Sequence, residues 1–181
     1  MKKIMFNDKY GLTQAVLEGR KTQTRRTFLK SGEETLLDGI TPEYLISVRS
    51  RYKVGETVAI AQPYADITPQ VDWVKCMIRK ETLGWNNKMF VRAEDMPHHI
   101  RITKIRIERL QDIKSEDCLN EGLWRAGDVG LEGTTYWYHG LSNSSFRTPQ
   151  EAYASLIDRI SGKGTWVNNP YVFVYDFELI D

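Results

Sequence analysis

One short segment, residues 19–26, concentrates side chains that can do chemistry. It reads Gly-Arg-Lys-Thr-Gln-Thr-Arg-Arg, so amine, hydroxyl and guanidinium groups lie within eight residues of one another. An amine can act as a base when burial or neighbouring cations lower its pKa, and a hydroxyl can act as a nucleophile or orient a water. The guanidinium groups of Arg25 and, above all, Arg26 suit a phosphate or a carboxylate, because each can pair with two oxygens. The segment therefore predicts an anion-binding site, a hydrolytic site, or both.

A purely structural interpretation of the same segment stays open. Backbone carbonyls at a helix end accept hydrogen bonds, and Lys21 and Thr22 are placed to donate them. Arg26 can equally form a salt bridge with one of the many acidic side chains. On this interpretation the segment stabilises the fold and binds nothing.

Aromatic side chains elsewhere are candidates for stacking on a nucleobase. Single-stranded or flipped bases are commonly held against aromatic faces, and Tyr64, Trp124 and Trp137 are the candidates here. Packing in the core explains each of them as well. The three histidines lack the spacing and the acidic companions of a metal site, so we expect no metal and no cofactor.

The elements on either side must position residues 19–26. Asp8 can cap a helix whose apolar residues keep a helical spacing until Gly19 ends it, so residues 21–26 are expected just past a helix C-terminus. Further helices are expected over residues 41–48, capped by Thr41, over residues 116–121, capped by Ser115, and over residues 148–160, opened by a capping box. Strands are expected over residues 3–6, 57–61, 71–79, 88–92, 100–110 and 171–180, with a turn at 84–87 joining the third and fourth into a hairpin.

The longest predicted strand carries a change of parity. Ile100 and Ile102 face one way in an extended chain, whereas Ile105 and Ile107 face the other. A β-bulge near residues 103–104 would keep all four on the same side.

Most strands follow one another without an intervening helix, which favours antiparallel or mixed pairing. The expected fold class is α+β, a closed or nearly closed mixed β-barrel with short peripheral helices. Residues 123–146 are rich in glycine and aromatics without clear periodicity, and we expect a long functional loop there.

Composition limits the class of protein. The chain has 181 residues, of which 41% are apolar and 27% charged, as expected of one globular domain spanning residues 1–181. Polar residues 7–9 break any signal-like apolar stretch, and no run of about 18 apolar residues is present. We therefore expect a cytoplasmic protein without a membrane partner. Cys76 and Cys118 are far apart, which favours free buried thiols over a disulfide or a zinc site.

The net charge of +1 conceals a gradient along the chain. Residues 1–53 carry 11 basic and 6 acidic side chains, a net charge of +5, and residues 111–181 carry 5 and 11, a net charge of −6. This distribution excludes a uniformly basic coat for nucleic acid. It leaves room for a local basic face from the N-terminal third, or for charges that cancel once the chain folds.

Four segments, in order, resemble the ASCH domain family of the PUA-like superfamily, particularly its bacterial and phage members. The segments are the helix end and basic loop of residues 15–26, the glycine-acidic turn of 55–58, the strand and helix of 105–122, and the closing Trp-x-x-Asn-Pro and strand of 166–177. The resemblance implies a PUA-like β-barrel associated with recognition of RNA or modified nucleosides. It also implies insertions near residues 27–50 and 123–147.

One branch of this family, the bacterial acetylcytidine amidohydrolases, is distantly similar and implies roles for three residues. Its lysine, threonine and glutamate correspond to Lys21, Thr24 and Glu121, which would act as base, nucleophile and acid without a metal. One departure is Gln62, a neutral amide where many phage-type relatives have an acidic residue. Two other functions stay open: a noncatalytic module that binds RNA or a nucleotide, and a phage-derived accessory domain that binds a protein partner.

Overall fold

The computed structural model describes residues 1–28, 39–67, 79–127, 133–141 and 145–181. The strands are β1 (Lys2–Ile4), β2 (Gln23–Thr27), β3 (Thr57–Ile60), β4 (His99–Arg109), β5 (Trp124–Ala126), β6 (Thr135–Trp137) and β7 (Tyr171–Leu179). The α-helices are α1 (Leu12–Leu17), α2 (Pro42–Arg49), α3 (Tyr64–Ile67), α5 (Ser115–Asn120), α6 (Pro149–Ser161) and α7 (Thr165–Asn168). Short 3-10 helices are η1 (Asp8–Tyr10), η4 (Leu83–Trp85), η5 (Lys88–Phe90), η6 (Ala93–Asp95) and η7 (Leu110–Asp112).

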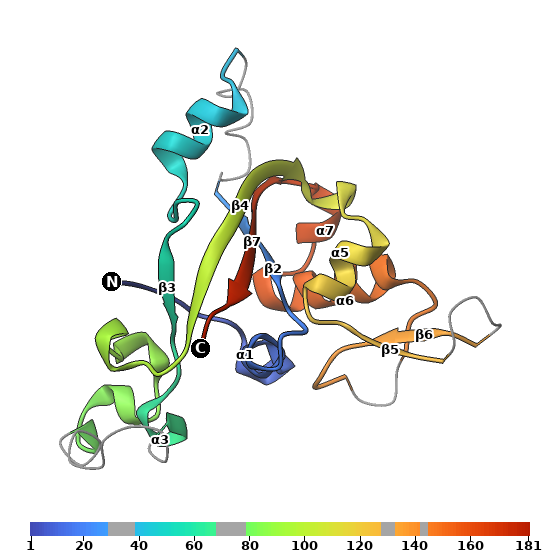
Figure 1. The fold of residues 1–181 in the computed structure, drawn as a ribbon. Coiled ribbons are helices and arrows are strands. Elements are labelled where there is room, and N and C mark those ends of the chain that lie inside the picture. Colours follow the sequence, from blue (N-terminus) through green and yellow to red (C-terminus); the bar gives the residue numbers. More distant parts are fainter. Residues whose placement is uncertain (29–38, 68–78, 128–132, 142–144) are drawn as a thin grey trace.

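The main sheet of the described residues has five strands in the order β1-β3-β4-β7-β2. Strand β1 runs parallel to β3, and the other neighbours are antiparallel. The mixed α+β class predicted from the sequence is therefore confirmed. Strands β1 and β2 form the two ends of the order, and no ladder joins them in the described part of the chain, so the sheet is not closed there. Figure 1 shows α5, α6 and α7 gathered on one side of β7 and β2.

Strands β4 and β7 form the longest pairing of the sheet. Their register shifts between Ile102, opposite Phe177, and Lys104, opposite Asp176. This irregularity is the bulge predicted from the isoleucine parity, because it brings Ile105 to the same face of the strand as Ile102. Ile102 is fully buried and Ile105 packs against the same core.

Two predicted helix starts are confirmed in detail. The side chain of Thr41 accepts a hydrogen bond from the backbone N–H of Tyr44 at the start of α2. Thr148 and Glu151 form the predicted capping box of α6. Helix α6 then buries one apolar stripe in the core, including Leu156. At α5 the prediction was off by one residue, because Lys114 occupies the N-cap position.

Several sequence predictions were wrong. Residues 88–92 form η5 and an extended exit, and the expected turn at 84–87 follows η4, so the predicted hairpin is absent there. The first strand of the predicted hairpin, at 71–79, lies almost wholly outside the described residues. The expected long loop contains the β5–β6 ribbon. Residues 23–27 form a strand that periodicity did not indicate, because all five are polar. Gln23 and Arg25 join a buried polar cluster, and Arg26 and Thr27 are exposed.

Gly122 holds the turn after α5 with a φ of 99° and approaches the N-terminal helix closely. A Cβ there would lie 3.2 Å from the Cβ of Ala15 and 3.4 Å from that of Lys21. Gly55 also has positive φ, 82°, but a Cβ there would meet no described atom within 4 Å.

We expect Gly55→Ala to lower the free energy of unfolding by about 1–2 kcal/mol, the cost of a left-handed conformation for a residue with a Cβ. Gly122→Ala should lower it by about 1–3 kcal/mol more, because it adds overpacking. Urea unfolding of both variants measures the difference. Equal losses would contradict the close approach at Gly122.

Candidate functional site

Lys21 and Glu121, 100 residues apart in sequence, are brought together by backbone hydrogen bonds. The N–H of Lys21 donates to the carbonyl of Ala15 in α1, at 2.9 Å. The N–H of Thr22 donates to the carbonyl of Asn120 at the end of α5, also at 2.9 Å. The loop before β2 is thus bound to two helix ends. These bonds place the side chains of Lys21 and Glu121 next to each other.

The two side chains form a buried ion pair. Nζ of Lys21 lies 2.5 Å from Oε2 of Glu121, and the residues are only 2% and 5% exposed. The same Nζ donates to the carbonyls of Gln23 at 2.7 Å and of Glu121 at 2.9 Å. The structural interpretation is therefore correct in part, since Lys21 does satisfy a carbonyl at the end of α5. The three contacts fix the position of the amine.

Arg25 lies behind this pair and holds the other oxygen of the carboxylate. Its side chain is fully buried, and Nη1 lies 3.2 Å from Oε1 of Glu121. Its Nη2 lies 3.2 Å from both Glu108 and Asp117, and Nη1 also donates to the side chain of Gln23. The structure thus surrounds Arg25, a predicted ligand-binding residue, with protein acceptors. In this arrangement it orients the Glu121 carboxylate.

Burial shifts two proton affinities in the site. It lowers the pKa of Lys21 below the ordinary value of 10.5; the attraction of Glu121 opposes this, and the positive charges of Arg26 and Arg25 add to it. Burial also raises the pKa of Tyr153 well above 10.0, and the Glu121 carboxylate raises it further. The amine is therefore shifted towards its neutral form, and the phenol keeps its proton.

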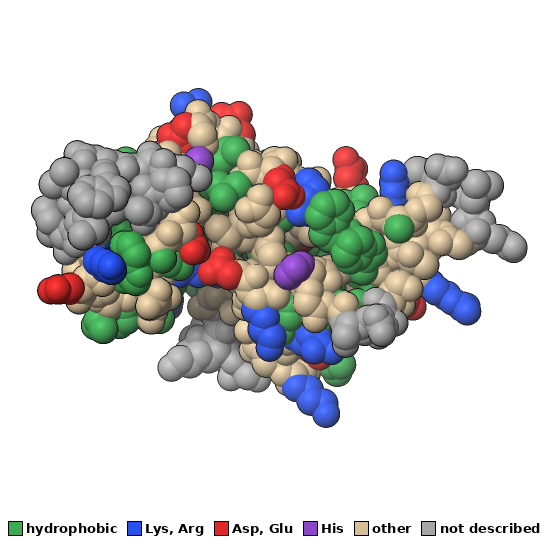
Figure 2. All heavy atoms as spheres, turned by 90° about the horizontal axis from the view of Figure 1, so that it is seen from below, with side chains coloured by type: hydrophobic (Ala, Val, Ile, Leu, Met, Phe, Trp, Pro, Cys, Tyr) green, Lys and Arg blue, Asp and Glu red, His purple; other side chains and the backbone are tan. Residues whose placement is uncertain are grey.

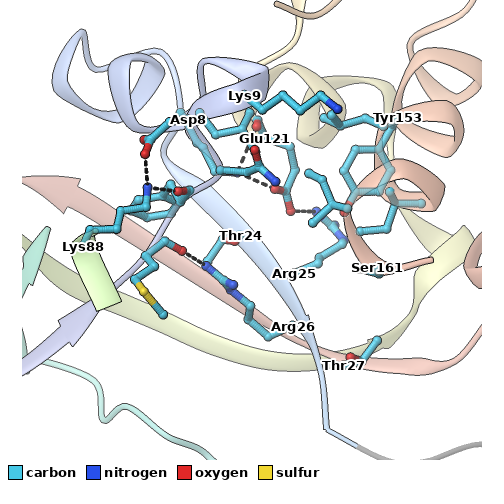
Figure 3. Close-up of a pocket in the computed structure, with 18 residues that line it drawn as sticks. Asp8, Lys9, Thr24, Arg25, Arg26, Thr27, Lys88, Glu121, Tyr153 and Ser161 are labelled. Carbon is cyan, nitrogen blue, oxygen red and sulfur yellow. Dashed lines mark hydrogen bonds and ion pairs between the residues drawn. The ribbon is translucent and has the colours of Figure 1, made fainter. Parts of the chain in front are cut away.

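A cavity of about 730 Å³ opens in front of the ion pair. Figure 3 shows its lining contributed by the N-terminal segment, β2, Glu121 just after α5, Lys88 of η5, and α6. Thr24 lines it, and the hydroxyl of Thr24 forms no hydrogen bond to any residue that the structure describes. Cavities of this size commonly hold small molecules. The three residues predicted as catalytic therefore line a single cavity, although Thr24 is not hydrogen-bonded to Lys21.

Arg26 lies at the mouth of the cavity and spans the ends of the sheet. Its Nη2 donates to the carbonyl of Met5, just after β1, at 2.6 Å (Figure 3). The remaining N–H groups of this exposed guanidinium have no partner in the described residues, so they are available to a ligand. Across the cavity, Lys88 pairs with Asp8 at 2.7 Å.

The predicted aromatic residues lie elsewhere. Tyr64 is buried in a second, smaller core, where its hydroxyl donates to Asp95 at 2.7 Å. Trp124 and Trp137 stack on each other across β5 and β6, with centroids 5.5 Å apart, and the guanidinium of Arg20 lies 3.6 Å from the Trp124 ring. Among the described residues, none of the three predicted aromatics lines the cavity.

Sequence reasoning missed Tyr153, which lines the cavity from α6. Its hydroxyl has no hydrogen-bond partner in the part of the chain that the structure describes, and Figure 3 shows the residue on the same side as Glu121 and Arg25. Helical spacing gives Tyr153 an apolar position on α6, the same signal as a core residue. Only the fold reveals that its polar end reaches the site.

The described residues show neither a uniformly basic face in Figure 2 nor a metal site. Acidic and basic side chains are interspersed on the face shown in Figure 2, as expected without a uniformly basic coat. Cys118 is buried and free, and burial raises its pKa to about 12; Cys76 lies outside the described residues. Within the described ranges, no group of three His, Cys, Asp or Glu side chains could hold a metal. No described helix is long and apolar enough to cross a bilayer.

Comparison with protein-family models found no match, and comparison with curated proteins found none. Among solved structures, the chain is similar to protein EF3133 from Enterococcus faecalis V583, described as a DUF984 protein. The two share 16% sequence identity with a TM-score of 0.45, over 100% of this chain and 81% of the other. A likeness at this level carries no argument about function, which has to rest on the site.

We expect Glu121→Gln to lower the free energy of unfolding by about 3–5 kcal/mol, because it leaves Lys21 and Arg25 buried without their shared carboxylate. The matched control is Glu178→Gln, which removes an exposed carboxylate 3.4 Å from Arg101 and should change stability by less than about 1 kcal/mol. Urea unfolding of both variants compares them. Similar small losses would show that the buried cluster contributes little.

Proposed function

We propose that this chain is an amidohydrolase that acts on an acylated nucleoside such as acetylcytidine, in an ASCH domain of the PUA-like superfamily. One observation carries the proposal: a buried Lys21–Glu121 contact of 2.5 Å borders a cavity that is also lined by Thr24, whose hydroxyl has no hydrogen-bond partner in the described ranges. The bond from Arg26 to Met5, which spans the two ends of the sheet, supports a nearly closed barrel.

The first step uses the ion pair as a proton relay. Transfer of one proton from Lys21 to Glu121 across their short contact gives an amine and a carboxylic acid. Burial favours the neutral amine of Lys21, since it penalises the charged ammonium. The amine of Lys21 then accepts the proton of Thr24 as the Thr24 oxygen attacks the acyl carbon.

The tetrahedral intermediate needs a hydrogen-bond donor for its oxyanion and a proton for its leaving group. Tyr153 is suited to the first role, because its raised pKa keeps the hydroxyl protonated at the cavity wall. Glu121, now protonated, donates to the exocyclic nitrogen of the nucleobase as the C–N bond breaks. The free nucleoside leaves and an ester on Thr24 remains.

Water completes the reaction. A water molecule attacks the ester carbonyl and passes its proton through Lys21 and Glu121 to the Thr24 oxygen. Acetic acid leaves and releases its proton to the solvent, and the site returns to its initial state. Each cycle therefore converts one amide and one water to an amine and a carboxylic acid, with the proton relay unchanged.

A specific observation favours a second function, noncatalytic binding of RNA or a nucleotide. The Nζ of Lys21 has three acceptors within 2.9 Å, the number that an ammonium group can satisfy. A lysine that is held as an ammonium group by three acceptors is a structural cation. Arg26 would then bind the ligand while no bond is broken.

Turnover of acetylcytidine by the purified protein, followed as release of cytidine, tests the first function. Lys21→Arg keeps the charge but cannot release a proton, so the rate should fall about 10²–10⁴-fold. Thr24→Val removes the nucleophile, so its rate should fall at least as far. Tyr153→Phe should lower kcat about 10²–10³-fold. Thr22→Val, in the same segment but outside the cavity, should change little.

Two outcomes would contradict hydrolysis. The first is no turnover by the wild-type protein, with salt-sensitive binding of RNA instead, which is the result expected of the noncatalytic module. The second is turnover that Lys21→Arg and Thr24→Val both leave unchanged, since the reaction would then occur elsewhere.

A further inference from the structure

A second cavity, of about 390 Å³, lies on the other side of Arg26. Three residues, Met5, Arg26 and Thr27, line both cavities, so a ligand in one lies next to a ligand in the other. The described lining of the second cavity includes four basic side chains and no acidic one. The four basic residues are Lys3, Arg26, Arg49 and Arg51.

Two of these cations are anchored to the protein. The Nζ of Lys3 donates to the carbonyls of Met89 at 2.7 Å and Val91 at 2.6 Å. Arg26 is held through its Nη2, as described above. These two positive charges are therefore fixed in place, and neither is neutralised by a carboxylate among the described residues.

The other two cations, Arg49 and Arg51, are exposed and available. Arg49 lies in the last turn of α2, and the guanidinium of Arg51 lies 5.7 Å from the centre of the Tyr52 ring. Neither guanidinium forms an ion pair with a carboxylate in the described residues. Glu56, a nearby acid, is occupied by Lys2 at 3.0 Å.

The charges around this cavity repel one another. Burial lowers the pKa of Lys3, and the positive charge of Arg51 lowers it further. In the first cavity each lining carboxylate is paired with a cation, whereas the positive charges of the second have no carboxylate partner among the residues that the structure describes. A bound anion would relieve this repulsion and gain several charge-assisted hydrogen bonds.

The floor of the cavity is aromatic. Tyr52, Phe173 and Tyr175 form it, and all three are buried. The hydroxyl of Tyr52 donates to the carbonyl of Lys3, and that of Tyr175 is bonded to Ser50 at 3.1 Å. An apolar floor under a basic rim strengthens the electrostatic attraction, because the local dielectric is low.

We propose that the second cavity is an anion subsite in which Arg26, Arg49 and Arg51 bind a phosphate carried by the substrate, whose acylated nucleoside occupies the first cavity. This inference rests on the proposed function and specifies its substrate class: a nucleotide, or a nucleotide within a single strand, rather than a free nucleoside. Arg26 connects the two subsites.

The kinetic test compares acetylcytidine, its 5′-monophosphate and a single-stranded oligonucleotide containing one acetylcytidine. The wild-type protein should show a higher kcat/KM for at least one phosphate-bearing substrate than for the nucleoside. In the double variant Arg49→Gln/Arg51→Gln this preference should fall about tenfold. The matched control is Arg159→Gln, an exposed arginine in the last turn of α6 that lines neither cavity, and it should keep the preference.

The two phosphate-bearing substrates identify the source of the phosphate. If the monophosphate and the oligonucleotide have the same kcat/KM, both above that of the nucleoside, the subsite binds the 5′-phosphate of the substrate nucleotide. If only the oligonucleotide has a higher kcat/KM, the subsite binds a neighbouring phosphodiester. Equal kcat/KM for all three substrates, or a preference that survives the double variant, would overturn the subsite.

Binding separates this inference from the proposed reaction. Anisotropy of a labelled, unacetylated single-stranded oligonucleotide at several salt concentrations gives the dependence of log K on log salt. Because the proposed subsite holds one phosphate, and one phosphate contact on a single strand contributes a slope of about 0.7, the double variant should make the dependence less steep by up to about 0.7. If this occurs without turnover of any substrate, hydrolysis fails and the subsite stands. If turnover occurs and the slope is unchanged, the subsite fails and hydrolysis stands.

Discussion

A lysine and a glutamate buried side by side are the constraint on which the rest of this structure depends. Burying a single charge is so unfavourable that the group must be paired, hydrogen-bonded or neutralised. Here the amine of Lys21 has the Glu121 carboxylate and two carbonyls, and the carboxylate has Arg25 on its other side. The backbone bonds that join the loop to α1 and α5, and the close approach at Gly122, hold these partners in place.

The same arrangement connects stability to function. The cluster behind β2 is closed by protein partners, whereas the side of the pair that faces the cavity leaves the hydroxyls of Thr24 and Tyr153 without protein hydrogen bonds among the described residues. Groups that are buried, polar and unsatisfied are positioned for a ligand. Arg26 lines both cavities. It therefore connects the proposed reaction site at Lys21 and Glu121 with the proposed anion subsite.

Sequence patterns predicted those parts of the fold that local chemistry determines. The isoleucine parity indicated the β4 bulge, and the capping residues at Thr41 and Thr148 indicated two helices. Strand β2 was missed because its polar residues pair with a charged network that only tertiary structure creates. The convergence of Lys21 and Glu121 was implied by a family resemblance, whereas Tyr153 required the fold, since its helical position is that of a core residue.

The proposed reaction depends on the proton affinity of the Lys21 amine, which nitrogen-15 NMR of its side chain measures. Nζ should titrate with a pKa below the ordinary lysine value of 10.5, because burial outweighs the attraction of Glu121. Glu121→Gln should lower this pKa again, since the carboxylate is the group that raises it. A Lys21 pKa at or above 10.5, or one that Glu121→Gln leaves unchanged, would show that the buried amine is not poised to accept a proton.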